Sequence, residues 1–106
     1  MSKLPAQYVG ISKKFKKYSK AVENLGKAAK SAGPIKAKNS HLIQMAAAAA
    51  IRSEGAVHSH ARRALQAGAS PEELQHAIIL LSSTIGFPTV SAALSWVDDV
   101  IKGDKS

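Results

Sequence analysis

Apolar residues recur along the first third of the chain at alternating spacings of four and three positions. The stripe consists of Leu4, Tyr8, Ile11, Phe15, Tyr18, Val22, Leu25 and Ala29. A period of 3.5 residues is typical of one face of an α-helix, and Gly33 and Pro34 follow as stop signals. We therefore predict one long, lysine-covered helix whose apolar stripe packs against the chain's own core or against a sister subunit.

Four more helices are expected after this one, and the period-two alternation of β-strands is absent. They are expected at about 35–53, at about 56–67, at 71–86 and from Pro88 to about Ile101. Inward-facing residues are expected on three of these helices. They are Leu42, Met45, Ala46 and Ala49 in the helix at 35–53; Leu74, Ala77, Ile78, Leu81 and Ile85 in the helix at 71–86; and Val90, Ala93, Leu94, Val97 and Ile101 in the last helix. The sequence thus predicts an all-α fold of about five helices.

The sharpest local signal is the segment "SPEEL" at residues 70–74. Ser70 is expected to cap a helix, Pro71 suits the first helical position, and Glu73 is placed to reach back to the backbone N–H of Ser70. Together they predict a capping box at the start of the fourth helix.

The chain has 106 residues and no cysteine. This length predicts a single domain over 1–106, with a helical arm at 1–33 and a helical core at 34–103, and it favours a homo-oligomer because so short a chain buries little surface alone. The absence of cysteine excludes disulfides and thiolate nucleophiles. The longest apolar run is interrupted by Gln44 and is too short for a membrane span, and the first ten residues lack an apolar signal region. We therefore expect a cytoplasmic protein with no membrane partner.

The net charge of +8 is concentrated at one end of the chain. Residues 1–38 contain ten lysines and a single acidic residue, whereas the remaining residues are close to neutral. Contact with polyanions is therefore expected only through this first third. We expect weak, non-specific and salt-sensitive binding of nucleic acid at most.

The segment "RSEGAVHSHARRAL", residues 52–65, contains two of the four histidines and all three arginines, whereas the other twelve basic residues are lysines. A guanidinium binds a carboxylate with a planar fork, and an imidazole exchanges protons near neutral pH. His58 and His60 are separated by roughly 200° around a helix axis. If His60 faces a site, His58 faces elsewhere, and we expect it in a solvated or interface position.

From Gly33 to about Ile101 the chain resembles the carboxymuconolactone decarboxylase family, which includes the alkylhydroperoxidase D-like proteins. The segments that carry the resemblance are "GPIKAKNSHLIQMAAAAA", "HARRALQAGASPEELQHAI" and "GFP". The resemblance implies an all-α fold and a homo-oligomer, often a trimer or a hexamer. It also implies a functional pocket at His60.

Three positions depart from the alkylhydroperoxidase branch of that family. Its Cys-x-x-Cys pair falls on Ser53 and Ala56, and its glutamate on the entry helix falls on His41. Without these cysteine thiols the chain cannot carry out thiol peroxidase chemistry. The departures therefore favour the decarboxylase branch.

Taken together, these features predict a cofactor-independent lyase or isomerase that acts on a small carboxylate. His60 and His41 are the candidate acid–base residues, and Arg52, Arg62 and Arg63 are the candidates for binding the substrate carboxylate. We expect no metal; a set of His41, His60 and Glu54 is the less favoured alternative. A second hypothesis is a family member without thiols that serves as a binding or structural oligomer. A third is a polyanion-binding oligomer that displays the lysine-rich helix several times.

Overall fold

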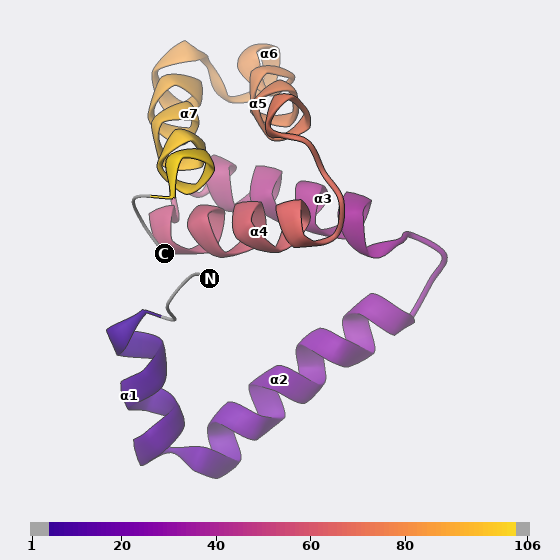
Figure 1. The fold of residues 1–106 in the computed structure, drawn as a ribbon, viewed down its shortest axis with the longest axis vertical. Coiled ribbons are helices and arrows are strands. Elements are labelled where there is room, and N and C mark those ends of the chain that lie inside the picture. The colour runs from indigo at the N-terminus through magenta and orange to yellow at the C-terminus, as the bar shows by residue number, and fades with distance from the viewer. Residues whose placement is uncertain (1–4, 104–106) are drawn as a thin grey trace. The chain divides into compact units, whose positions relative to one another are not determined.

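The computed structural model describes residues 5–103, which form seven helices and no strand (Figure 1). The helices are α1 (Ala6–Lys14), α2 (Lys16–Ser31), α3 (Ala37–Ala50), α4 (Glu54–Gln66), α5 (Pro71–Ile79), α6 (Ser82–Ile85) and α7 (Phe87–Lys102). The all-α prediction is thus confirmed. The chain divides into two compact units, one ending at Lys36 and one beginning at Ala37.

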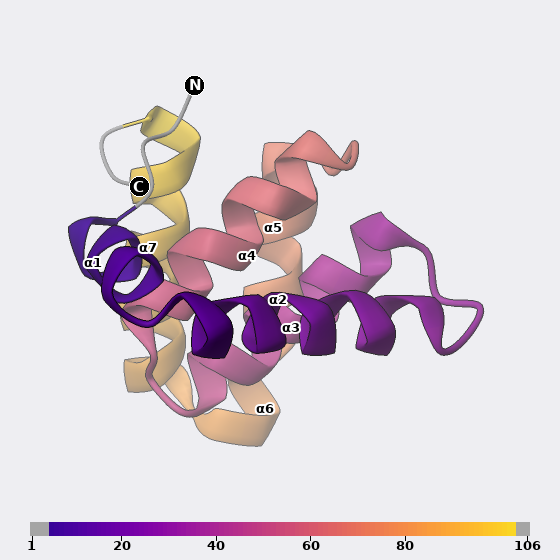
Figure 2. The same cartoon turned by 90° about the horizontal axis from the view of Figure 1, so that it is seen from below.

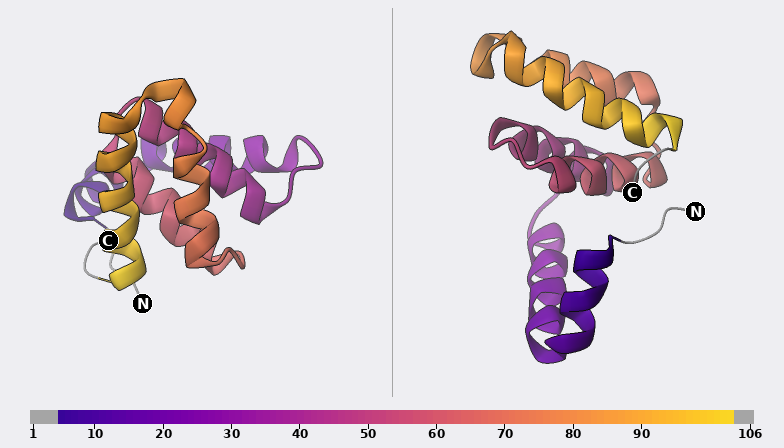
Figure 3. Two further views of the ribbon diagram at one scale, coloured as in Figure 1. Left: turned by 90° about the horizontal axis from the view of Figure 1, so that it is seen from above. Right: turned by 90° about the vertical axis from the view of Figure 1, so that its left-hand side faces the viewer.

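The first unit is a helical hairpin, so the prediction of one continuous helix is wrong. The chain leaves the helical conformation at Phe15, whose φ is −123° and ψ is 68°, and α1 then lies beside α2 (Figure 3). Tyr8 donates a hydrogen bond to Glu23 over 3.2 Å, and the hydroxyls of Ser12 and Ser19 lie 3.1 Å apart. Leu4, where the predicted stripe begins, lies outside the described residues.

Lysines on both sides of Phe15 give a physical reason for this break. They are Lys13, Lys14, Lys16 and Lys17. In a continuous helix, residues three or four positions apart are neighbours, and like charges there destabilise the helix by a few tenths of a kcal/mol per pair. The apolar spacing that predicted one long helix took no account of this repulsion.

The second unit has two layers, with α3 and α4 in one and α5 and α7 in the other (Figure 3). The short helix α6 occupies the turn between α5 and α7 (Figure 2). The core is made of apolar side chains from α3, α4, α5 and α7, the largest being Met45, Val57, Leu74, Ile78, Val90 and Val97. The inward faces expected for the later helices are therefore confirmed at their central positions.

The predicted helix over 71–86 is wrong in its second half, because it ends at Ile79 and a separate turn of helix, α6, follows. The hydroxyl of Ser82 donates to the carbonyl of Ile79 over 2.7 Å. Such side-chain bonds offer the backbone an alternative to the continuing helical ladder. The predicted stop at Gly86 is present, and its φ of 87° is a conformation that glycine adopts readily.

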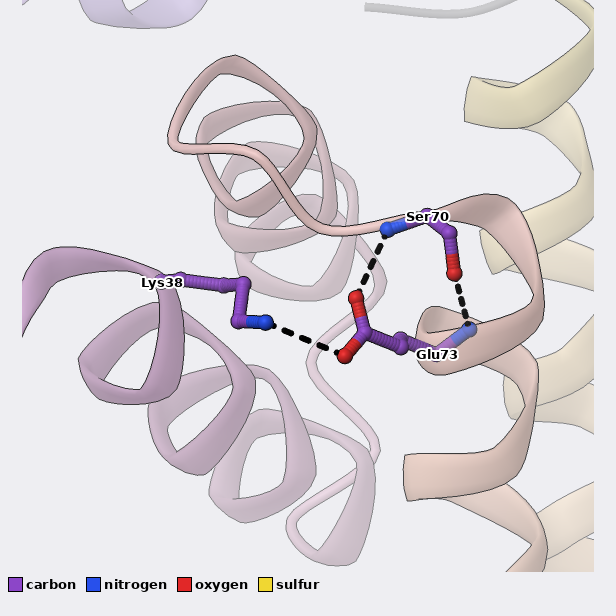
Figure 4. Close-up of polar contacts among 3 residues, drawn as sticks. All are labelled: Lys38, Ser70 and Glu73. Atoms are coloured by element: carbon purple, nitrogen blue, oxygen red, sulfur yellow. Dashed lines mark hydrogen bonds and ion pairs between the residues drawn. The ribbon is translucent and has the colours of Figure 1, made fainter.

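The capping box predicted from "SPEEL" is present at the start of α5 (Figure 4). The backbone N–H of Glu73 donates to the Ser70 hydroxyl over 3.0 Å, and the Ser70 N–H donates to the Glu73 carboxylate over 2.9 Å. The other carboxylate oxygen of Glu73 pairs with the Lys38 ammonium at 3.1 Å. This carboxylate therefore joins the start of α5 to the first turn of α3.

We predict that this carboxylate makes the free energy of unfolding of the protein depend on pH in the acidic range. The backbone N–H of Ser70, and after it Lys38, lower the pKa of Glu73 from its ordinary value of 4.5. A carboxylate with a lowered folded-state pKa contributes stability above its unfolded pKa, and this contribution is lost as the pH falls through the folded-state value. The Glu73→Gln variant keeps an oxygen for the Ser70 N–H but loses the charge. Its free energy of unfolding should therefore fall less between neutral and acidic pH than that of the wild type.

Urea unfolding of both proteins at a series of pH values measures this difference. Glu72→Gln is the matched control, because Glu72 is the neighbouring exposed carboxylate outside the capping box. If the wild type and Glu73→Gln lose stability in parallel as the pH falls, the prediction is wrong.

Candidate functional site

The packing of α3 against α4 brings His41 and His60 together. Their Nδ1 atoms lie 3.2 Å apart and their ring centroids 5.4 Å apart. His41 is buried, with 5% of its surface exposed, whereas His60 is partly exposed. These two residues, called the histidine pair below, are thus a buried imidazole behind a more accessible one.

The distance between the two Nδ1 atoms is that of a hydrogen bond. A neutral imidazole has one nitrogen that donates and one that accepts, so the two rings of the histidine pair must be opposite tautomers if both are neutral. If one ring takes up a proton, its Nδ1–H still donates to the other ring. The contact therefore supports both the neutral pair and a singly protonated pair.

Arg63 is the arginine that the structure places at the histidine pair. Its Nη2 atom lies 3.5 Å from His60 Nδ1 and donates to the Ser59 hydroxyl over 3.0 Å. A guanidinium N–H only donates, so when Arg63 bonds to His60 Nδ1, that atom accepts and His41 Nδ1 is the donor. A fixed positive charge therefore lies next to the accessible imidazole.

The other two arginines lie elsewhere. Arg52 follows α3 with a φ of 56°, an uncommon conformation for a residue with a side chain, and it donates to the Thr89 hydroxyl on α7 over 3.0 Å. Arg62 is roughly 200° around the α4 axis from His60, and its Nη1 atom is buried without a hydrogen-bond partner in the described chain. Of the three candidate arginines, the structure thus brings Arg63 to the imidazoles.

His58 faces away from the histidine pair, as the helix geometry predicted, but it is not solvated. It is 6% exposed, and its Nε2 atom lies 3.2 Å from a carboxylate oxygen of Asp99 on α7. Of the two positions expected for His58, solvated or at an interface, the solvated one is wrong, because α7 packs over this face of α4. The sequence offered no signal for this contact, since the two residues are 41 positions apart.

Glu54 also belongs to the His58 side of α4. Its carboxylate lies 3.8 Å from His58 Nε2, as expected for residues four positions apart on a helix. The less favoured metal set of His41, His60 and Glu54 is therefore not assembled. Among the described residues, Glu54 instead forms a potential ligand group with His58 and Asp99.

The two positions that align with the Cys-x-x-Cys pair lie where α4 starts. Ser53 is the residue before its first turn, and Ala56 lies within that turn. Neither side chain supplies a sulfur atom to the neighbourhood of the histidine pair. Because this chain contains no cysteine, it has no thiols for the redox chemistry of a dithiol pair.

The fold and the site define an all-α protein with two imidazoles in contact between packed helices and with no thiol. Over residues 16–99 the chain matches the carboxymuconolactone decarboxylase family, and it belongs to that family. Comparison with curated proteins and with solved structures gave no match. None of the helices between residues 5 and 103 combines the length and apolarity that a membrane crossing requires.

Proposed function

We propose that this chain is a cofactor-independent lyase or isomerase of the carboxymuconolactone decarboxylase type that acts on a small carboxylate. The observation that carries the proposal is the 3.2 Å contact between Nδ1 of buried His41 and Nδ1 of accessible His60. It supplies an acid–base group with a fixed partner in a chain that has no thiol chemistry.

His60 is the residue that exchanges a proton with the substrate, through its Nε2 atom. Loss of CO2 from a carboxylate leaves an electron pair on the substrate, and a proton must then be delivered to that carbon. When the Arg63 guanidinium turns to the substrate carboxylate, His60 Nδ1 no longer accepts from it. A protonated His60 then donates the proton from Nε2, while its Nδ1–H bonds to His41 Nδ1. In this way His41 holds the ring in orientation and stabilises its charged form, as the orienting group of a catalytic triad does.

Arg63 is the residue that binds the substrate carboxylate. Its guanidinium lies 3.5 Å from the proton-transferring ring, so a carboxylate held there brings the rest of a small substrate close to His60. The planar fork of arginine suits bidentate carboxylate binding, which the ammonium of lysine does not provide. Arg52 and Arg62 lie away from the histidine pair and have no part in this proposal.

The second candidate function is that of a binding or structural oligomer without chemistry. The exposed apolar side chains of α2 favour it, because they provide a surface for self-association independent of the histidine pair. Both candidates include a homo-oligomer, with a trimer or hexamer favoured. The two differ only in whether the histidine pair turns over a substrate.

Incubation of the purified full chain with carboxymuconolactone separates the two candidates. We expect release of CO2 without any added cofactor, and at the same rate after treatment with iodoacetamide or EDTA, because neither a thiol nor a metal takes part. Assays with hydroperoxides and a dithiol reductant should show no turnover. A folded protein that releases no CO2 from this compound or from related lactone carboxylates would favour the second candidate.

A further inference from the structure

We propose that Glu54, His58 and Asp99 form a binding site for a divalent transition-metal ion such as Zn²⁺. His58 Nε2 lies 3.2 Å from Asp99 Oδ2 and 3.8 Å from Glu54 Oε2. The ligand atoms of all three residues lie within 4.8 Å of one another. We call these residues the α4–α7 cluster, because two come from α4 and the third from α7.

The local structure fixes the nitrogen donor and leaves the oxygen donors accessible. The side chain of His58 is 8% exposed, so packing holds its ring, whereas those of Glu54 and Asp99 are 54% and 31% exposed. An ion can therefore reach the cluster from solvent, and water can complete its coordination. Three protein ligands and one bound water complete the tetrahedral coordination that zinc prefers.

One separation between donor atoms already matches that around a single ion. Zinc binds imidazole nitrogen and carboxylate oxygen at about 2.0–2.2 Å, so two such ligands lie about 3–3.5 Å apart. The His58–Asp99 distance falls within this range, and the exposed Glu54 side chain would have to move its oxygen closer than the present 3.8 Å to His58 Nε2.

Without a cation, the α4–α7 cluster leaves its groups poorly matched. A single Nε2–H has one proton to share between two carboxylates, and the two carboxylates repel each other at this separation. A divalent ion would satisfy the nitrogen and both oxygens together. One imidazole with two carboxylates favours zinc and its first-row neighbours over Mg²⁺ and Ca²⁺, which prefer oxygen ligands alone.

The cluster is separate from the histidine pair, because α4 presents His60 to α3 and His58 to α7. Metal binding there is therefore independent of the proposed acid–base chemistry. A structural role is the one that the position supports, since an ion bridging α4 and α7 would hold the two layers of the second unit together.

An isothermal calorimetric titration of the untagged, metal-free full chain with Zn²⁺ tests the site. We expect one ion per chain, and affinity about tenfold or more lower in Glu54→Gln and in Asp99→Asn, because each removes a charged ligand. Zn²⁺ should also raise the unfolding temperature of the wild type more than that of either variant. Mg²⁺ should give no comparable effect.

Three variants are matched controls that should bind Zn²⁺ like the wild type. Glu72→Gln removes an exposed carboxylate outside the cluster, and Asp98→Asn changes the neighbour of Asp99 while keeping an oxygen for its bond to Gln75. His41→Ala removes one imidazole of the histidine pair. Absence of Zn²⁺ binding, unchanged affinity in both ligand variants, or loss of binding in His41→Ala would each overturn the proposal. Because Glu54 is exposed, the Glu54→Gln variant should fold like the wild type.

Discussion

Replacement of His60 by alanine should lower kcat/KM for carboxymuconolactone by about 10²–10⁴-fold, the range that positioned acid–base groups contribute. The fold should survive, because His60 is partly exposed on α4 and alanine favours the helix. The His41→Ala variant should be impaired less, since in the proposed mechanism His41 only orients the ring that exchanges the proton. Steady-state kinetics together with circular dichroism of each variant measure both expectations.

The matched control is His76→Ala, which removes an exposed histidine on α5 and should leave the rate unchanged. Added imidazole should restore part of the activity of His60→Ala, because free imidazolium can enter the space left by the ring and deliver the proton. A purely structural role for His60 predicts no such rescue. Full activity in His60→Ala would contradict the assignment of the acid–base residue.

Light scattering at micromolar concentration should show a homo-oligomer, with a trimer or hexamer as the expected state. The reason is the exposed apolar ridge of the first unit. Its members Phe15, Tyr18, Val22 and Leu25 are 48–70% exposed and recur at helical spacing. Monomeric proteins rarely leave so continuous an apolar strip in water. Burial of a large apolar side chain stabilises an interface by about 1.5–3 kcal/mol.

The Leu25→Lys variant should therefore shift the assembly toward monomers, because it places a charge within the apolar contact that the ridge is expected to form. Ile51→Lys is the matched control, since Ile51 is 77% exposed but lies after α3 and off the ridge. A wild-type protein that scatters as a monomer would contradict the prediction of an oligomer. Dissociation of Ile51→Lys, but not Leu25→Lys, would place the interface on the second unit instead.

Features that depend on neighbours along the chain could be read from the sequence. The capping box at Ser70 and Glu73, the stop at Gly86 and the inward faces of the later helices follow from local hydrogen bonding and helical periodicity. The same reasoning went wrong where electrostatics or a side-chain bond interrupts a periodic stretch, at Phe15 and at Ser82. Periodicity describes which face is apolar, but it does not include the terms that end a helix early.

Some features of the candidate site could likewise be read from the sequence, and others depended on tertiary structure. That His58 and His60 face opposite sides of α4 follows from 3.6 residues per turn, and the family resemblance placed His41 near His60. That Arg63 lies beside His60 while Arg62 faces away follows from the same helical spacing, whereas the position of Arg52, bonded to Thr89 on α7, depended on tertiary structure.

The meeting of His58 with Asp99 depended on tertiary structure as well, because it requires α7 to pack over α4 at one particular register. Helical periodicity shows which face of each helix is buried. It does not show which helix covers that face, or at what height, because that is set by how the apolar side chains of two distant segments fit together.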